Sequence, residues 1–146
     1  MENPAFTIRR ATENDAAAIA GLAATLGYQV DITAMAKRLK AILGSAADLV
    51  LVAEKAMAPI GWLQAHAAHV VESGFRVEIM GLVVAPEQRR GGAGRRLMAE
   101  AERWAHGIGA QAVVVRSNVQ RVESHAFYPA LGYTPTKTQN VYRKNL

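Results

Sequence analysis

The stretch Arg89-Arg90-Gly91-Gly92-Ala93-Gly94-Arg95 joins a strand-like run to an amphipathic helix, and this junction decides the fold. The run before it, residues 75–84, is rich in branched side chains and is followed by Pro86. The segment after it repeats apolar residues at helical spacing, at Leu97, Ala101, Trp104 and Ala105. The sequence therefore predicts a strand, a glycine-rich loop and a helix in direct succession.

The composition of this loop favours a bound anion. Glycine lets the backbone bring its N–H groups close to a ligand, and the first turn of a helix leaves four N–H groups without partners. The helix dipole adds partial positive charge at that end. Four arginines beside it would be unfavourable to the dipole unless an anion sat among them: Arg89, Arg90, Arg95 and Arg96. We therefore expect the loop to bind a phosphate or pyrophosphate group.

Two common phosphate-binding loops do not fit this stretch. A P-loop requires a Gly-Lys-Ser/Thr triplet, which the sequence lacks. A dinucleotide fingerprint requires Gly-x-Gly-x-x-Gly in the first strand–helix unit, whereas this loop lies past the middle of the chain. Gly92 and Gly94 could supply the first two glycines of that pattern, but Leu97 takes the third place.

A third pattern does fit. Arg89, Gly92 and Gly94 satisfy Arg/Gln-x-x-Gly-x-Gly/Ala, and the loop thereby resembles the acetyl-coenzyme A loop of the GNAT superfamily of N-acetyltransferases. A second phasing that begins at Gln88 also satisfies the bare pattern. We prefer the first, because Pro86 and Leu97 then fall where the family places them.

A late block strengthens the resemblance. The family's late motif is an Asn after the fifth strand, a short helix holding Phe-Tyr, and then Leu-Gly-Phe/Tyr. This chain reads Asn118, then Phe127-Tyr128, then Leu131-Gly132-Tyr133. Because residues 8–15 also look like the family's opening strand and helix, the resemblance covers essentially all 146 residues.

The elements expected from the pattern give an α/β fold. Their order predicts a mixed, mostly antiparallel sheet flanked by helices, and the resemblance implies the GNAT fold, with a splay between strands 4 and 5 that admits the pantetheine arm. We expect one domain spanning residues 1–146. Strands are expected at residues 7–10, 49–54, 60–71, 75–84, 112–116 and 140–143. Helices are expected from a cap at Thr12 or Asn14 to about residue 26, at 32–43, from the end of the glycine-rich loop to about residue 106, and near 121–131.

Composition excludes several other classes of protein. The hydrophobic content of 51% with 20% charged residues is typical of a globular domain. No stretch reaches the ~20 apolar residues of a membrane span, no signal segment opens the chain, and cysteine is absent. We expect a cytoplasmic protein, without nucleic-acid or membrane partners, that could form a homodimer. The net charge of +5 suits a coenzyme with several phosphate charges.

The resemblance implies acetyl-CoA as the acetyl donor and an amine as the acceptor. Backbone N–H groups around Met80 to Leu82 would bind the carbonyl oxygen, and Gly81 suits a β-bulge that frees such groups from the ladder. Close packing is the alternative role for Gly81. The expected coenzyme-binding residues are Leu82, Val83, Val84, Arg89, Arg90, Gly91, Gly92, Ala93, Gly94, Arg95 and Asn118.

Two residues are expected to carry the proton transfers. Tyr128 occupies the family's tyrosine position and would protonate the leaving thiolate, although Pro129 beside it could disturb its aim. Glu78 would act as the base, directly or through water, with a salt-bridged strand acid as the alternative. Strand alternation places Glu78 on the side of Met80 and Leu82 unless a bulge reverses the later residues.

No metal site is expected. His66 and His69 differ by an odd number within one strand, so they face opposite sides of the sheet. His125 could tune the site from a position three residues before Tyr128, with a structural role as the alternative.

These observations predict an acetyl-CoA-dependent N-acetyltransferase that transfers acetyl directly to a primary amine of a small molecule or peptide. The alternative is a non-catalytic acyl-CoA sensor of the same fold. The basic surface disfavours polycationic acceptors.

Overall fold

The computed structural model describes residues 5–117 and 121–146. The chain forms two compact units, Met1–Val115 and Arg116–Leu146. Within the described residues, no helix is long and apolar enough to cross a membrane.

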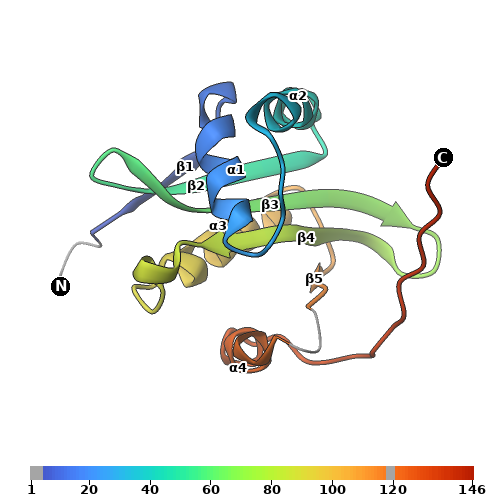
Figure 1. Cartoon of the computed structure of the whole chain (residues 1–146). Coiled ribbons are helices and arrows are strands. Elements are labelled where there is room, and N and C mark those ends of the chain that lie inside the picture. The colour runs from blue at the N-terminus through green and yellow to red at the C-terminus, as the bar shows by residue number, and fades with distance from the viewer. Residues whose placement is uncertain (1–4, 118–120) are drawn as a thin grey trace. The chain divides into compact units, whose positions relative to one another are not determined.

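The first unit is built on a five-stranded sheet in the order β1-β2-β3-β4-β5 (Figure 1). Neighbouring strands are antiparallel except for β4 and β5, which are parallel, so the predicted mixed sheet is confirmed. The strands are β1 (Thr7–Arg10), β2 (Asp48–Lys55), β3 (Ala58–Val70), β4 (Gly74–Val84) and β5 (Val113–Val115).

Two tight connections form the hairpins of this sheet. Ala56 and Met57 join β2 to β3 with φ of +50° and +66°, which is the turn geometry that suits the right-handed twist of paired strands. Gly74 opens β4 with φ of +86°, where a residue without Cβ is favoured. Both turns lie between strands that the sequence predicts.

Capping residues mark the start of α2 and the end of α1. Asp31 accepts a hydrogen bond from the Ala34 N–H at 2.7 Å and caps α2, and Gly27, with φ of +88°, follows α1. In the first unit the α-helices are α1 (Ala16–Ala24), α2 (Ile32–Leu43) and α3 (Ala93–Gly107), with 3₁₀ turns at Glu13–Asp15 and Pro86–Gln88.

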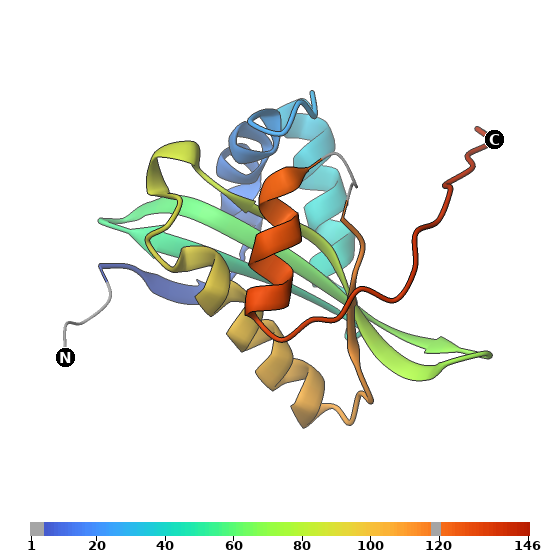
Figure 2. The same ribbon diagram turned by 90° about the horizontal axis from the view of Figure 1, so that it is seen from below.

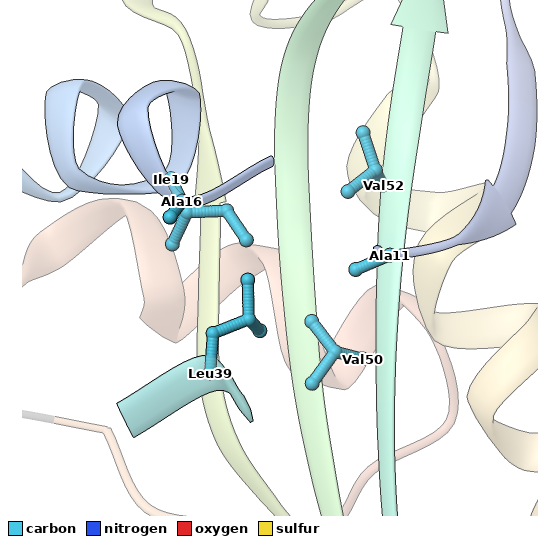
Figure 3. Close-up of a cluster of buried hydrophobic side chains, with 6 residues drawn as sticks. All are labelled: Ala11, Ala16, Ile19, Leu39, Val50 and Val52. Atoms are coloured by element: carbon cyan, nitrogen blue, oxygen red, sulfur yellow. The ribbon is translucent and has the colours of Figure 1, made fainter. Parts of the chain in front are cut away.

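The sheet has a helix layer on each face. Helices α1 and α2 cover one face and α3 covers the other (Figure 2). Val50 and Val52 of β2 pack with helix residues on the first face, in a cluster that also holds Ala11, Ala16, Ile19 and Leu39 (Figure 3). Because side chains alternate along a strand, Leu49 and Leu51 face α3 instead, where they line a groove with Trp104.

Helix α3 is anchored through its apolar stripe. Leu97 and Ala101 are 0% exposed, and Met98 and Ala105 are nearly so. Full burial of a side chain such as Leu97 contributes about 1.5–3 kcal/mol relative to an exposed one. This packing fixes the start of α3 next to the end of β4.

An ion-pair cluster ties β1 to the turn before α1. Both terminal nitrogens of Arg9 donate to the Asp15 carboxylate, each at 2.8 Å, and the Arg9 Nε donates to Glu54 at 2.7 Å. The Asp15 carboxylate also accepts from the Thr12 N–H at 2.8 Å. The bond from Arg9 lowers the pKa of Asp15 although burial opposes the shift, and the same bond raises the pKa of Arg9.

The second unit contains α4 (Val122–Ala130). The helix ends in a Schellman motif: the N–H of Tyr133 donates to the Tyr128 carbonyl at 3.1 Å and the N–H of Gly132 donates to the Pro129 carbonyl at 3.0 Å. Gly132 has φ of +95°, a left-handed conformation that explains the glycine in the Leu-Gly-Tyr motif.

The predicted strand at residues 140–143 is wrong. The structure assigns residues 133–146 to neither helix nor strand. The apolar residues there, Val141 and Tyr142, are adjacent and do not alternate with polar ones, and both are exposed, at 86% and 88%. Neither side chain buries the apolar surface that would favour a strand.

Candidate active site

Strand β4 contains a β-bulge at the point expected from Gly81. Gly81 is opposite Gln64 of β3 while Ile79 is opposite Ala65, so Met80 is an extra residue in β4. A bulge leaves the extra residue outside the regular ladder. The parallel ladder to β5 also ends at Ile79, which pairs with Val115. The pairing with β3 is interrupted at Met80 and resumes at Gly81, whereas the pairing with β5 does not extend beyond Ile79.

The bulge changes which residues share a face of β4. Glu78 lies opposite His66, and Gly81 lies opposite Gln64, on the face that α1 and α2 cover. Leu82, opposite Leu63, falls on the α3 face. The expectation that Glu78 and Leu82 share a side holds only for an unbulged strand, and the inserted Met80 reverses it.

Gly81 also packs tightly. A Cβ at this position would lie 2.7 Å from a ring carbon of Trp62, closer than real Cβ contacts allow. The bulge and the close approach to Trp62 are thus both present, and each requires a small residue here.

Hydrogen bonds at the two ends of β4 fix the direction of its amides. The Val77 N–H donates to the carbonyl of Ala112, just before β5, at 3.0 Å, and the Ala85 N–H donates to the carbonyl of Ile60, within β3, at 2.8 Å. Because successive amides of a strand alternate in direction, the N–H groups of Leu82 and Val84 are directed away from β3.

These amides lie beyond the part of β4 that pairs with β5. They are therefore suited to bind an extended chain that enters where the strands separate. Val83 differs, because its backbone N–H is directed towards β3. The residue is 3% exposed and belongs to the core.

The glycine-rich loop presents the start of α3. Arg90 has φ of +68° and Gly92 has φ of +92°, and the helix begins at Ala93. A positive φ at a residue other than glycine is uncommon and occurs where surrounding structure enforces it. The Arg90 backbone thus folds the chain back towards the helix start.

Few backbone bonds satisfy the amides of this turn. The Gly91 N–H donates to Gln88 at 3.4 Å, and Arg96 is the first helix residue whose N–H donates to a carbonyl, that of Gly92, at 3.0 Å. No side chain caps the helix within the described residues. The amides from Gly92 to Arg95 form a concentrated set of donors at the positive end of the dipole. Ala93 is 2% exposed, so it offers only its backbone.

Three of the four arginines remain at the loop. Arg89, Arg90 and Arg95 are exposed. Arg96 is turned away: its guanidinium lies 5.2 Å from the centre of the Phe6 ring and donates to the Phe6 carbonyl at 3.4 Å. The expected four-arginine cluster is therefore smaller, because Arg96 stacks on the residue just before β1.

Glu78 is a largely buried carboxylate in an ion pair. Its Oε1 accepts from Arg76 at 2.6 Å, and the side chain is 15% exposed. The guanidinium holds the carboxylate in one orientation on the α1–α2 face. This is the salt bridge considered as an alternative to a catalytic role, and the two roles are compatible.

Tyr128 lies in α4, in the second unit. Its ring makes edge contacts with Phe127 and Tyr133, with ring centres 5.0 and 6.0 Å apart. Burial raises the pKa of Tyr128, and the positive charge of Arg121 opposes that shift. The phenol is therefore protonated at neutral pH. Pro129 occupies the last turn without ending the helix before Ala130, and Asn118 lies outside the described residues.

The comparison with family models decides the classification. Residues 14–133 match the model of the acetyltransferase (GNAT) family. The chain belongs to the GNAT acetyltransferase family. The match spans the bulged strand, the glycine-rich loop and the late Phe-Tyr block of this family member. No curated protein matches the chain.

Solved structures share the fold. The aminoglycoside N-acetyltransferase AAC(6')-Iy in complex with CoA is 23% identical, with 97% of this chain and 95% of that chain covered and a TM-score of 0.87. A transcriptional regulator from Bacillus halodurans C-125 is 21% identical over 95% and 99% of the two chains, with a TM-score of 0.88. AAC(6')-Ih from Acinetobacter baumannii is 21% identical over 97% and 99%, with a TM-score of 0.84.

One constellation on the α1–α2 face was not predicted. The His66 Nδ1 lies 2.9 Å from the Asp48 Oδ1, a contact between residues of neighbouring strands that are 18 positions apart in the chain. The sequence contains both residues in strand segments, but the pairing of Asp48 with His66 follows only from the register between β2 and β3.

Proposed function

We propose that this family member uses acetyl-CoA to acetylate a primary amine by direct transfer. One observation carries the proposal: the amides of Leu82 and Val84, directed away from β3 and beyond the ladder to β5, precede the donor-rich start of α3. An extended pantetheine arm along Leu82 and Val84 would bring its pyrophosphate to the loop from Arg89 to Arg95. Both parts belong to the first unit, so their relation rests on one continuous stretch of chain.

The loop suits the charge of the coenzyme. Backbone N–H groups and a helix start favour an anion without requiring a particular side chain. Arg89, Arg90 and Arg95 add positive charge around the same turn. The structural neighbour AAC(6')-Iy is described in complex with CoA, which supports the choice of ligand.

The chemistry divides among three groups of this chain. Amides at the bulge would stabilise the charge that develops on the thioester oxygen. Glu78 would take the proton of the acceptor ammonium, and Tyr128 would protonate the departing thiolate. The raised pKa of Tyr128 keeps the phenol protonated at neutral pH, so the hydroxyl can donate to the departing sulfur.

The acceptor is proposed at the level of a primary amine. Two structural neighbours are named as aminoglycoside acetyltransferases, and that acceptor is a property of those proteins. The net charge of +5 on this chain favours acceptors with few positive charges over polycationic ones, because like charges repel.

A screen of primary amines tests the proposal. The protein is mixed with acetyl-CoA and each amine, and released thiol is measured against reactions lacking amine. We expect thiol release that depends on the amine, with one acetylated amine formed per thiol. Tight coenzyme binding without turnover on any amine would favour the non-catalytic sensor. Absence of coenzyme binding would refute both.

A further inference from the structure

A row of polar side chains crosses three strands one step from the bulge. Asp48 of β2, His66 of β3 and Glu78 of β4 are register partners in sequence across the sheet. They share the face of Val50 and Gln64, which α1 and α2 cover. Directly opposite side chains in antiparallel strands have Cβ atoms about 5 Å apart.

Asp48 orients the imidazole in this row. The His66 Nδ1 and the Asp48 Oδ1 lie 2.9 Å apart, and the Asp48 side chain is 12% exposed. A carboxylate at Nδ1 holds the proton on that nitrogen and leaves Nε2 with its lone pair. The His66 side chain is 42% exposed, so the ring also reaches water.

Glu78 differs from His66 in its access to solvent. It is largely buried and held by Arg76 at 2.6 Å. A base in that position must discharge its proton after each turnover before it can act again. The neighbour opposite it in the ladder is His66, whose ring is oriented and reaches solvent.

The charged side chains closest to His66 in the ladder come from the strands of its own face. Helix α1 carries no titratable side chain, and the basic residues of α2, namely Lys37, Arg38 and Lys40, are exposed. On the strands, the register places Asp48 and Glu78 directly opposite His66, and Arg76 pairs with Glu78 at 2.6 Å.

We propose that His66, oriented by Asp48, is a proton-relay residue for Glu78, an inference that rests on the proposed function. The proton of the acceptor ammonium moves to the Glu78 carboxylate and then to Nε2 of neutral His66. The imidazolium releases it to water. Glu78 returns to its carboxylate form and His66 to its neutral form, and no covalent bond other than those to this proton changes in the relay.

The chain supplies a matched control for testing this relay. His69 lies on the same strand as His66 with opposite phase, and its ring stacks on Phe75 with centres 4.3 Å apart. The test compares wild type, His66→Asn and His69→Asn, with kcat against pH, acetyl-CoA affinity by calorimetry, and added imidazole. Asparagine can donate to Asp48 but cannot carry a proton.

We expect His66→Asn to lower kcat at least about tenfold, less than the ~10²–10⁴ of a direct acid or base. Added imidazole should restore the lost rate in proportion to its concentration, and coenzyme affinity should stay unchanged. His69→Asn should behave as wild type. If His66→Asn does not fold, His66→Gln carries the same test.

An undiminished kcat for His66→Asn overturns the relay. A loss that imidazole does not relieve also overturns it, because that result assigns His66 a structural role. A wild-type protein inactive on every amine would instead refute the proposed function, so the two failures are distinguishable.

Discussion

Gly92 offers the sharpest test of the anion site, because two substitutions there differ only in charge. Gly92 has φ of +92° and ψ of 0°, and a Cβ at this position would meet no heavy atom within 4 Å. The cost of a side chain is therefore a backbone cost, about 1–2 kcal/mol for a left-handed conformation. Asn and Asp tolerate this conformation best among residues other than glycine.

The change to Asp adds a negative charge where the pyrophosphate is proposed to bind. At about 6 Å, each phosphate charge repels the carboxylate by about 0.7 kcal/mol in water and about 2.8 kcal/mol at a protein surface. Two phosphate charges then give at least about 1.4 kcal/mol, which is a tenfold loss of affinity. We expect Gly92→Asp to bind acetyl-CoA at least tenfold more weakly than Gly92→Asn.

Calorimetry with acetyl-CoA measures both affinities, and thermal unfolding checks the fold. Both variants should remain folded, with Tm lower by roughly 4 °C for each 1 kcal/mol lost. The difference between the two affinities should shrink in high salt, because screening acts on the added charge. Equal affinities for Gly92→Asp and Gly92→Asn at low salt would refute the anion site.

Three further predictions address the catalytic groups and the ion-pair cluster. Tyr128→Phe should lower kcat by about 10²–10⁴-fold while acetyl-CoA affinity by calorimetry stays constant; an unchanged kcat where chemistry limits the rate would assign Tyr128 to packing. Glu78→Gln should lower kcat/KM and flatten its rise at low pH, and an unaltered pH profile would mean that another group takes the proton. Asp15→Asn should cost about 2–3 kcal/mol at neutral pH, below the 3–5 kcal/mol of a fully buried pair, because Arg9 is 35% exposed. The pKa of Asp15 is lowered in the folded protein, so its stabilisation is present above the unfolded-state pKa and is lost as pH falls through the folded pKa. The stability gap between wild type and Asp15→Asn, measured by denaturant unfolding, should therefore close in acid; a gap independent of pH would contradict the pairing with Arg9.

The local chemistry of the chain was sufficient to predict the segment from β4 to α3. Branched residues, Pro86, the glycines and the apolar stripe of α3 each specify a local conformation, and they agree with one another. The bulge was also predictable from Gly81. Its consequence for Leu82 was not, because one inserted residue reverses every later side chain and depends on the pairing with β3.

Features that depend on distant partners were missed or mistaken. Arg96 was grouped with the loop, but it stacks on Phe6, ninety positions away in the chain. The contact of Asp48 with His66 depends on the register of β2 and β3. The strand expected at residues 140–143 was inferred from local apolar residues, and these bury little surface.

The most direct test of the central claim compares two acetyl donors. Acetyl-CoA and S-acetylpantetheine share the thioester and the pantetheine arm, but only acetyl-CoA carries the pyrophosphate. Calorimetry on the wild-type protein should show that acetyl-CoA binds at least tenfold more tightly, and that this advantage is largely lost in Gly92→Asp. Equal affinities for the two donors would contradict the claim that the loop from Arg89 to Arg95 binds the pyrophosphate.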